Sequence, residues 1–151
     1  MINKRYKEKL REFLYVNNLL NWESITLTMK QRVNDEKLDK IKSYLNFKYF
    51  MNRLNTLIYG NTFRRYGKRI EVIPILENSR DNRLHYHILI KRPERVSSIR
   101  FRFMIKEEWN KTKFGYEEVC FNEETNNGWI NYITKSKRED KVDWESFYRV
   151  C

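Results

Sequence analysis

Residues 83–90 read RLHYHILI and contain the only two histidines of the chain, His85 and His87. The stretch is rich in residues that favour β-strands, and alternate side chains of a strand point to the same face. Both imidazoles therefore leave one surface of the predicted strand, about 6 to 7 Å apart. Two neutral imidazoles at that spacing can hold one metal ion from a rigid platform.

A hairpin is predicted to place this strand beside another one. Residues 69–76 and 84–91 both have strand character, and the polar stretch 78–82 between them is typical of a turn. An antiparallel pair of this kind brings side chains of the first strand opposite the histidines.

A third metal ligand is expected from the first strand of this hairpin. A register that pairs Glu77 with His85 also pairs Ile75 with His87, and it puts the Glu77 carboxylate on the histidine face. A register shifted by one residue would turn that carboxylate away. Glu71 is the reserve candidate, on the same face but about 20 Å farther along the strand. Either glutamate could instead be an ordinary exposed charge.

Residues 128–135 read GWINYITK and form a second group of interest. In a helix, Tyr132 and Lys135 lie three residues apart on one face. A metal platform followed by a tyrosine with a lysine beside it indicates phosphoryl transfer. The alternative is an ordinary core aromatic, because apolar residues surround the tyrosine on the same helix.

These residues carry a family resemblance. Residues 85–87, His-Tyr-His, resemble the histidine-hydrophobic-histidine motif of HUH endonucleases. Residues 132–135, Tyr-Ile-Thr-Lys, resemble the tyrosine-x-x-lysine motif of the rolling-circle replication initiators in that superfamily. Residues 26–28, Thr-Leu-Thr, are similar to its first and weakest motif. The motifs follow the family's order and together span residues 25–135.

The resemblance implies a nicking reaction on DNA and an acidic metal ligand before the histidine pair. A divalent ion, Mn²⁺ or Mg²⁺, would orient the scissile phosphate, and Tyr132 would attack it, leaving a 5′-phosphotyrosyl link and a free 3′-hydroxyl. Lys135 could lower the pKa of the tyrosine or stabilise charge on the phosphate. The expected partners are a single-stranded or hairpin DNA origin, with a host helicase and polymerase.

The fold class expected is α+β. The pattern predicts a helix at 4–20, a strand at 25–29, a long helix from an N-cap at Asp35 to near Gly60, strands at 69–76 and 84–91, a helix at 97–111, a strand at 116–121 and a helix at 127–137. The apolar positions expected for the long helix are Leu38, Ile41, Leu45, Tyr49, Leu54 and Leu57. This order suits an antiparallel sheet of about four to five strands with helices packed on it. The HUH resemblance implies the ferredoxin-like version, whereas the pattern alone leaves several sheet orders open.

Composition favours a basic, DNA-binding domain. At 151 residues the chain is expected to be a single nuclease domain, residues 1–151, without a helicase domain. It has 31 Lys and Arg against 20 Asp and Glu, a net charge of +11, which favours polyanionic partners. The candidate DNA-binding residues are Arg64, Arg65, Lys68, Arg69, Arg100 and Arg102.

Two cysteines, Cys120 and Cys151, are too few and too far apart to indicate a disulfide framework. A reducing, cytoplasmic location is the simpler expectation. Apolar runs all fall short of the roughly 20 residues of a membrane span, and the N-terminus does not resemble a signal peptide, so no membrane partner is expected.

Other classes fit the histidines less well. Non-haem iron oxygenases and cupins need a further histidine far from the first pair, and the chain has none. Mobilisation relaxases place the tyrosine before the histidines, the reverse of the order here. Single-tyrosine transposases are closer, although their motif tends to end in glutamine where this chain has Lys135. Such a transposase, and a catalytically silent origin- or promoter-binding protein of the same fold, stay open as alternatives.

Overall fold

The computed structural model describes residues 21–78, 81–122, 146 and 148. The helices predicted at 4–20 and 127–137, the second with Tyr132 and Lys135, lie outside the described residues. The described elements are β1 (Trp22–Met29), β2 (Arg32–Val33), β3 (Glu36–Lys37), α2 (Lys40–Tyr59), α3 (Asn61–Tyr66), β4 (Val72–Asn78), β5 (Leu84–Lys91), α4 (Ser98–Asn110) and β6 (Gly115–Asn122).

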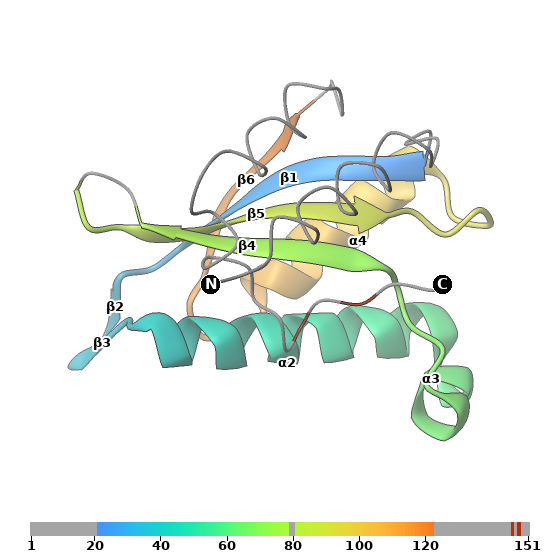
Figure 1. The fold of residues 1–151 in the computed structure, drawn as a ribbon, viewed down its shortest axis with the longest axis horizontal. Helices are drawn as coiled ribbons and strands as arrows, with labels where there is room; N and C mark the ends of the chain where they lie inside the picture. The colour runs from blue at the N-terminus through green and yellow to red at the C-terminus, as the bar shows by residue number, and fades with distance from the viewer. Residues whose placement is uncertain (1–20, 79–80, 123–145, 147, 149–151) are drawn as a thin grey trace, which may run out of the picture.

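Four strands form an antiparallel sheet in the order β4-β5-β1-β6, and α2 and α4 pack on it (Figure 1). The short strands β2 and β3 pair separately as a small hairpin. Leaving that hairpin and α3 aside, the order of elements is βαββαβ with the first strand in the middle of the sheet, which is the ferredoxin-like arrangement. The predicted α+β fold class is therefore confirmed.

The main core lies between the sheet and the two long helices. Every second residue of the central strands points into it, so Ile25 and Leu27 of β1 and Tyr86 of β5 have no exposed surface. Phe47 of α2 stacks on Tyr86 with ring centroids 4.5 Å apart. Since Tyr86 faces the helices, the residues on either side of it in β5 face the opposite surface of the sheet.

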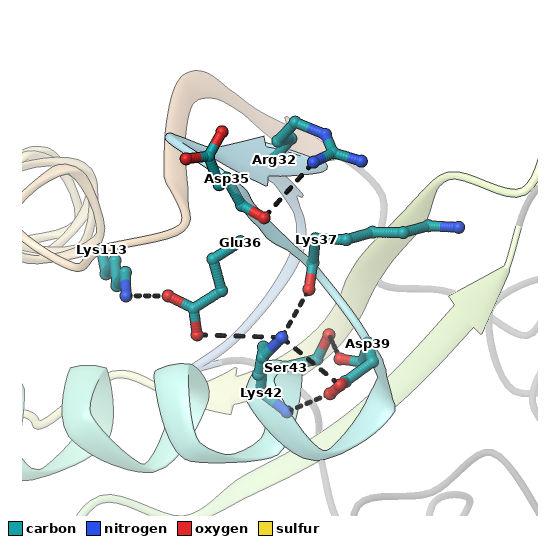
Figure 2. Close-up of polar contacts among 8 residues, drawn as sticks. All are labelled: Arg32, Asp35, Glu36, Lys37, Asp39, Lys42, Ser43 and Lys113. Atoms are coloured by element: carbon teal, nitrogen blue, oxygen red, sulfur yellow. Dashed lines mark hydrogen bonds and ion pairs between the residues drawn. The ribbon is translucent and has the colours of Figure 1, made fainter.

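The predicted start of the long helix is wrong. Its N-cap is Asp39, whose side chain accepts a hydrogen bond from the Lys42 amide at 2.8 Å, and not Asp35. Asp35 lies instead in the tight turn between β2 and β3 (Figure 2). Asn34 takes a positive φ of 53° in that turn, a conformation that asparagine tolerates better than most residues.

A charged cluster holds this small hairpin against the start of α2. Figure 2 shows Glu36 between Lys113, with which it forms a close ion pair, and Lys42, at 3.8 Å. The hydrogen bond from Lys113 is the main reason why the pKa of Glu36 lies below its ordinary value. The cluster ties the hairpin to the turn that precedes β6.

The predicted apolar face of the long helix is also largely wrong. Leu54 is buried as expected, and Leu38 is buried but precedes the helix. Four positions expected in the core are exposed: Ile41, Leu45, Tyr49 and Leu57. The buried face instead carries Phe47, Phe50, Met51 and Leu54 together with three small polar residues, Ser43, Asn46 and Asn55.

The buried polar residues of α2 belong in the core because they hydrogen-bond backbone groups of neighbouring segments. Asn46 accepts from the Phe114 amide at 3.0 Å, and Asn55 accepts from the Ile70 amide at 2.7 Å. A buried backbone N–H without a partner would cost about 1 to 3 kcal/mol, and the two asparagine side chains prevent that loss.

The remaining predicted elements lie close to their expected bounds. The strand predicted at 84–91 and the helix at 97–111 match β5 and α4, and Ser97 caps the latter. Strand β4 starts at 72 rather than 69, and residues 61–66 form the short helix α3, which the pattern did not predict. Within the part of the chain that the structure describes, no helix combines the length and the apolar character that crossing a membrane requires.

Candidate metal centre

The β4–β5 hairpin has the predicted register. Glu77 pairs with His85 and Ile75 pairs with His87. Because Tyr86 between the histidines packs against α2, both imidazoles leave the sheet on the face opposite the helices. Glu77 points to the same face, and the hairpin thus brings one carboxylate and two imidazoles together.

The three side chains converge closely enough to share one ion. Nε2 of His85 and Nε2 of His87 are 3.1 Å apart, and Oε2 of Glu77 lies 3.1 Å from His87 Nε2 and 3.8 Å from His85 Nε2. All three side chains are largely shielded yet keep 16–22% of their surface exposed, so the group is open to solvent. Among the described residues, these three form the group of histidine and acidic side chains whose ligand atoms lie close enough together to hold a metal ion.

The donor set fits a divalent ion. Two bonds of about 2.1 Å at right angles place their ligand atoms about 3 Å apart, close to the spacing of the His87 Nε2 atom from its two neighbours. Two imidazoles with one carboxylate suit Mn²⁺ or a similar borderline ion, and Mg²⁺ is the oxygen-preferring alternative. The three protein ligands would hold such an ion from one side only. Its remaining coordination positions would be open to oxygens of a substrate.

Both imidazoles are oriented through their other nitrogen. Nδ1 of His87 is 3.1 Å from the Thr26 hydroxyl, and Nδ1 of His85 is 3.3 Å from the carbonyl oxygen of Arg83. A carbonyl can only accept, so His85 carries its proton on Nδ1 in this contact, and its Nε2 presents a lone pair to the cluster. Outer contacts of this kind fix the ring and the tautomer of metal-binding histidines.

Gln31 fixes the start of the histidine strand. Its side-chain amide donates to the carbonyls of Met29 and Leu84, each at 2.9 Å, and its oxygen accepts from the Leu84 amide at 2.9 Å. The amide thereby joins the end of β1 to the residue before His85. Sequence reasoning missed both Gln31 and the contact of Thr26 with His87, because neither residue type signals a partner so far away in the chain.

Glu71 is not part of the cluster. It lies next to the start of β4, at the other end of that strand, where its carboxylate forms an ion pair with Lys91 at 3.2 Å. It precedes Glu77 by six positions, about 20 Å along a strand.

A sequence model of the replication-associated protein ORF2 family matches residues 23–137, about three quarters of the chain. The chain belongs to this family. The matched span contains Thr26, Glu77, both histidines and Tyr132. Searches of curated proteins and of solved structures gave no significant match.

The candidate DNA-binding residues of this replication-associated protein lie in two parts of the fold, one at α3 and the segment after it and one on α4. Arg64 and Arg65 belong to α3, and Lys68 and Arg69 follow it, at the end of the sheet away from the metal centre (Figure 1). Arg100 and Arg102 lie on α4. Arg102 pairs with the buried carboxylate of Glu23 at 3.0 Å, so its charge is already balanced within the fold.

The tyrosine motif lies outside the described residues, so Tyr132 and Lys135 stay predictions. The described residues on either side of the motif in sequence are at opposite edges of the sheet. Strand β6, which ends at Asn122, is one edge strand. On the other edge, the backbone of Tyr148 pairs with Val72 of β4 through hydrogen bonds of 2.9 and 3.1 Å.

Proposed function

We propose that this replication-associated protein is a metal-dependent nickase of the HUH type, which cuts one DNA strand at a replication origin. The observation that carries the proposal is the convergence of Glu77, His85 and His87 on the open face of the sheet. Membership of a replication-associated family makes DNA the natural substrate. A metal centre on such a protein is best explained by phosphoryl transfer.

Glu77, His85 and His87 would hold Mn²⁺ or Mg²⁺ in this proposal. When bound, the ion would polarise oxygens of the scissile phosphate and neutralise part of their charge. The protein's own contribution is the fixed geometry of the three ligands, which the Thr26 hydroxyl, the Arg83 carbonyl and the Gln31 side chain support from behind. A rigid site of this kind lowers the entropic cost of aligning the phosphate for attack.

Tyr132 is the proposed nucleophile. Its phenolic oxygen would lose its proton and form a bond to phosphorus while the bond from phosphorus to the 3′ oxygen breaks, and the departing 3′ oxygen takes up a proton to become a hydroxyl, so that no net proton is gained or lost. The 5′ side of the cut stays joined to the protein, and because one phosphate ester replaces another, the reverse reaction can reseal the strand. Lys135, one helical turn from Tyr132 in the predicted helix, would stabilise negative charge on the phenolic oxygen or the phosphate.

The location of the described residues on either side of the motif supports this role. Tyr132 falls in sequence between Asn122 on one edge of the sheet and Tyr148 on the other. The histidine strand β5 lies between these two edges. In the proposal, Tyr132 acts on the phosphate held at the metal centre of this strand.

A covalent adduct tests the proposal. The full chain would be incubated with Mn²⁺ and a labelled single-stranded origin oligonucleotide that cannot religate. The expected product is a protein–DNA species that survives denaturation and carries the 5′ side of the cut. Tyr132→Phe removes only the attacking oxygen, so it should eliminate the adduct while DNA affinity stays within about 3-fold.

Tyr116→Phe is the control variant, because it removes a phenol from β6, outside the tyrosine motif, and should keep the adduct. An adduct that persists in Tyr132→Phe would assign the nucleophile to another tyrosine. If the wild-type chain binds the origin of its own replicon but never forms an adduct there, the silent DNA-binding alternative is correct. An adduct formed on transposon ends but not on a replication origin would favour the transposase.

A further inference from the structure

A pocket of about 260 Å³ lies at the end of the sheet opposite the metal centre. Its walls come from the end of α2, the segment that leads from α3 into β4, and the segment that leaves β5. Figure 1 shows these segments meeting on the side of the sheet where α3 lies. Its charged and phenolic lining residues are four cations, two carboxylates and two tyrosines: Lys68, Arg69, Lys91, Arg92, Glu71, Glu94, Tyr59 and Tyr148.

Two of the four cations lining the pocket are already used within the fold. Lys91 is paired with Glu71 at 3.2 Å. Arg92 donates to the Val96 carbonyl at 2.6 Å and to the Asn21 side chain at 3.1 Å. Glu71 balances the charge of Lys91, whereas neutral oxygens fix the Arg92 guanidinium in the wall without neutralising it.

The other two cations, Lys68 and Arg69, have no carboxylate partner among the described residues. Lys68 Nζ lies 5.2 Å from the centre of the Tyr59 ring. The Arg69 guanidinium lies 5.5 Å from the Phe63 ring and 5.3 Å from the Tyr148 ring. Aromatic neighbours hold a cation in place without neutralising it, so both positive charges remain available to an anion.

Tyr59 adds a hydrogen-bond donor to the pocket. Its ring lies near two cations, Lys68 and Arg95, the latter at 5.5 Å. Burial is the main cause that raises the pKa of Tyr59 above its ordinary value, so the phenol keeps its proton at neutral pH. A neutral phenol beside two cations can donate to an anionic oxygen.

We propose that this pocket, formed around Lys68, Arg69 and Tyr59, is a second DNA contact that binds a backbone phosphodiester of the strand cut at the metal centre. The choice of DNA as the ligand rests on the proposed function, whereas the preference for an anion rests on the charges themselves. Cationic side chains and a phenol are the groups that proteins commonly use against backbone phosphates. The volume suits one phosphate with part of its sugar, not a whole duplex.

The distance between the two sites determines which phosphate is bound. Glu71 borders the pocket, and it precedes the metal-centre residue Glu77 by six positions along one extended segment, about 20 Å. At about 3.4 Å per nucleotide along one strand of a duplex, the bound phosphate lies about six nucleotides from the cut, and fewer in an extended single strand. Contacts at two separated points fix which phosphodiester meets the metal centre.

The test measures binding without chemistry. The full chain is titrated with a fluorescent oligothymidylate of about 20 nucleotides in EDTA, and the dissociation constant is followed by anisotropy over a range of salt concentrations. Removing one phosphate contact lowers the slope of log affinity against log salt by about 0.7. Because both side chains face the same phosphate, Lys68→Ala with Arg69→Ala is expected to lower the slope by about 0.7, and Lys68→Ala alone by a measurable part of that.

Lys106→Ala is the matched control, because it removes the same charge from an exposed position on α4. It should leave the slope unchanged. Arg69→Ala also removes a side chain packed against two rings, so thermal unfolding of each variant is compared. If the double variant unfolds early, Lys68→Ala and the charge-keeping Arg69→Lys decide, the latter retaining the wild-type slope.

A slope for Lys68→Ala equal to that of the wild type and of Lys106→Ala would overturn the second contact. Equal binding of polyglutamate and oligothymidylate, both abolished in Lys68→Ala, would overturn DNA as the specific ligand. Failure of the nicking proposal has a different signature, namely absence of the Tyr132 adduct with the salt slopes unaffected. The two proposals can therefore fail independently.

Discussion

The hydroxyl of Thr26 lies 3.1 Å from Nδ1 of His87, across the pairing of β1 with β5. A neutral imidazole carries one proton, and when Nδ1 donates it to this hydroxyl, the Nε2 lone pair faces the space shared with Glu77 and His85, where a metal ion would bind. The contact therefore links a threonine of the first strand to the candidate metal centre. It gives that threonine a physical role that its place in a weak motif does not reveal.

Thr26→Val should weaken metal binding. Valine keeps the branched shape and the strand preference of threonine but cannot accept the Nδ1 proton. Loss of an outer-shell partner of this kind typically costs about 10- to 100-fold in metal affinity. The measurement is a calorimetric titration of the purified chain with Mn²⁺.

Thr28→Val serves as the control for that titration, because the Thr28 hydroxyl donates to the backbone oxygen of Glu118 and not to a histidine. Its affinity for Mn²⁺ should equal that of the wild type. Identical affinities in both valine variants would show that the Thr26 contact does not orient His87.

Glu77, near the end of β4, and Glu71, just before its start, should differ in their effect on metal binding. Glu77→Gln keeps the size of the side chain but removes the charge 3.1 Å from His87 Nε2, so we expect Mn²⁺ affinity to fall by more than about 10-fold. Glu71→Gln should leave Mn²⁺ affinity unchanged, since Glu71 pairs with Lys91 at the far end of the strand. The reverse ranking in the same titration would contradict the site described above.

The histidine hairpin could be predicted because its signal is local. Side chains alternate with a period of two, so one residue pair fixes the faces of all the others, and the turn length restricts the register. These two constraints left few registers open, and the structure has the one that pairs Glu77 with His85. Their side chains then had to share a face.

The start of α2 could not be predicted in the same way. Asp35 and Asp39 are both good N-cap residues, and nothing nearby distinguishes them. Asp39 is the cap because residues 32–37 form a hairpin, which the Leu38 amide closes by donating to the Gln31 carbonyl at 2.8 Å and which Lys113 contacts from a distant part of the chain (Figure 2). Local patterns contain no information about such a partner.

Which face of α2 is buried also depends on residues that are far away in the sequence. The helix has two apolar stripes, one with Leu45 and Tyr49 and one with Phe47 and Phe50. Phe47 and Phe50 are buried because Tyr86 and Trp109 offer them aromatic partners at 4.5 and 5.3 Å. Those partners come from β5 and α4, so periodicity alone could not choose between the stripes.

The capping of α2 gives a stability prediction. Asp39→Ala removes the acceptor of the Lys42 amide and should lower the free energy of unfolding by about 1 kcal/mol. Asp35→Ala should change it by less than about 0.5 kcal/mol, because Asp35 accepts the hydrogen bond from Arg32 through its backbone oxygen, which alanine keeps. Urea unfolding followed by circular dichroism measures both, and a larger loss in Asp35→Ala would contradict the observed helix start.

Glu108 of α4 predicts how stability depends on pH. Burial would raise the pKa of this carboxyl, but hydrogen bonds from Lys111 at 3.0 Å and Arg53 at 2.7 Å more than offset burial and hold it below the ordinary value. A group whose pKa is lowered by folding stabilises the protein above its unfolded pKa, about 4 for glutamate. That contribution is lost as the pH falls through the lower, folded pKa.

Glu108→Gln should therefore lower the free energy of unfolding at pH 7 by about 1 to 3 kcal/mol, because glutamine cannot satisfy two cationic donors as a carboxylate does. The difference from the wild type should shrink below about pH 4, where the wild-type carboxylate begins to bind its proton. Urea unfolding at several pH values measures this difference in the free energy of unfolding. Glu107→Gln, at the exposed neighbouring position, is the control and should follow the wild type throughout. If the free energies of unfolding of the wild type and Glu108→Gln differ by the same amount at pH 7 and at about pH 3, then packing, not the charge of Glu108, stabilises this part of the fold.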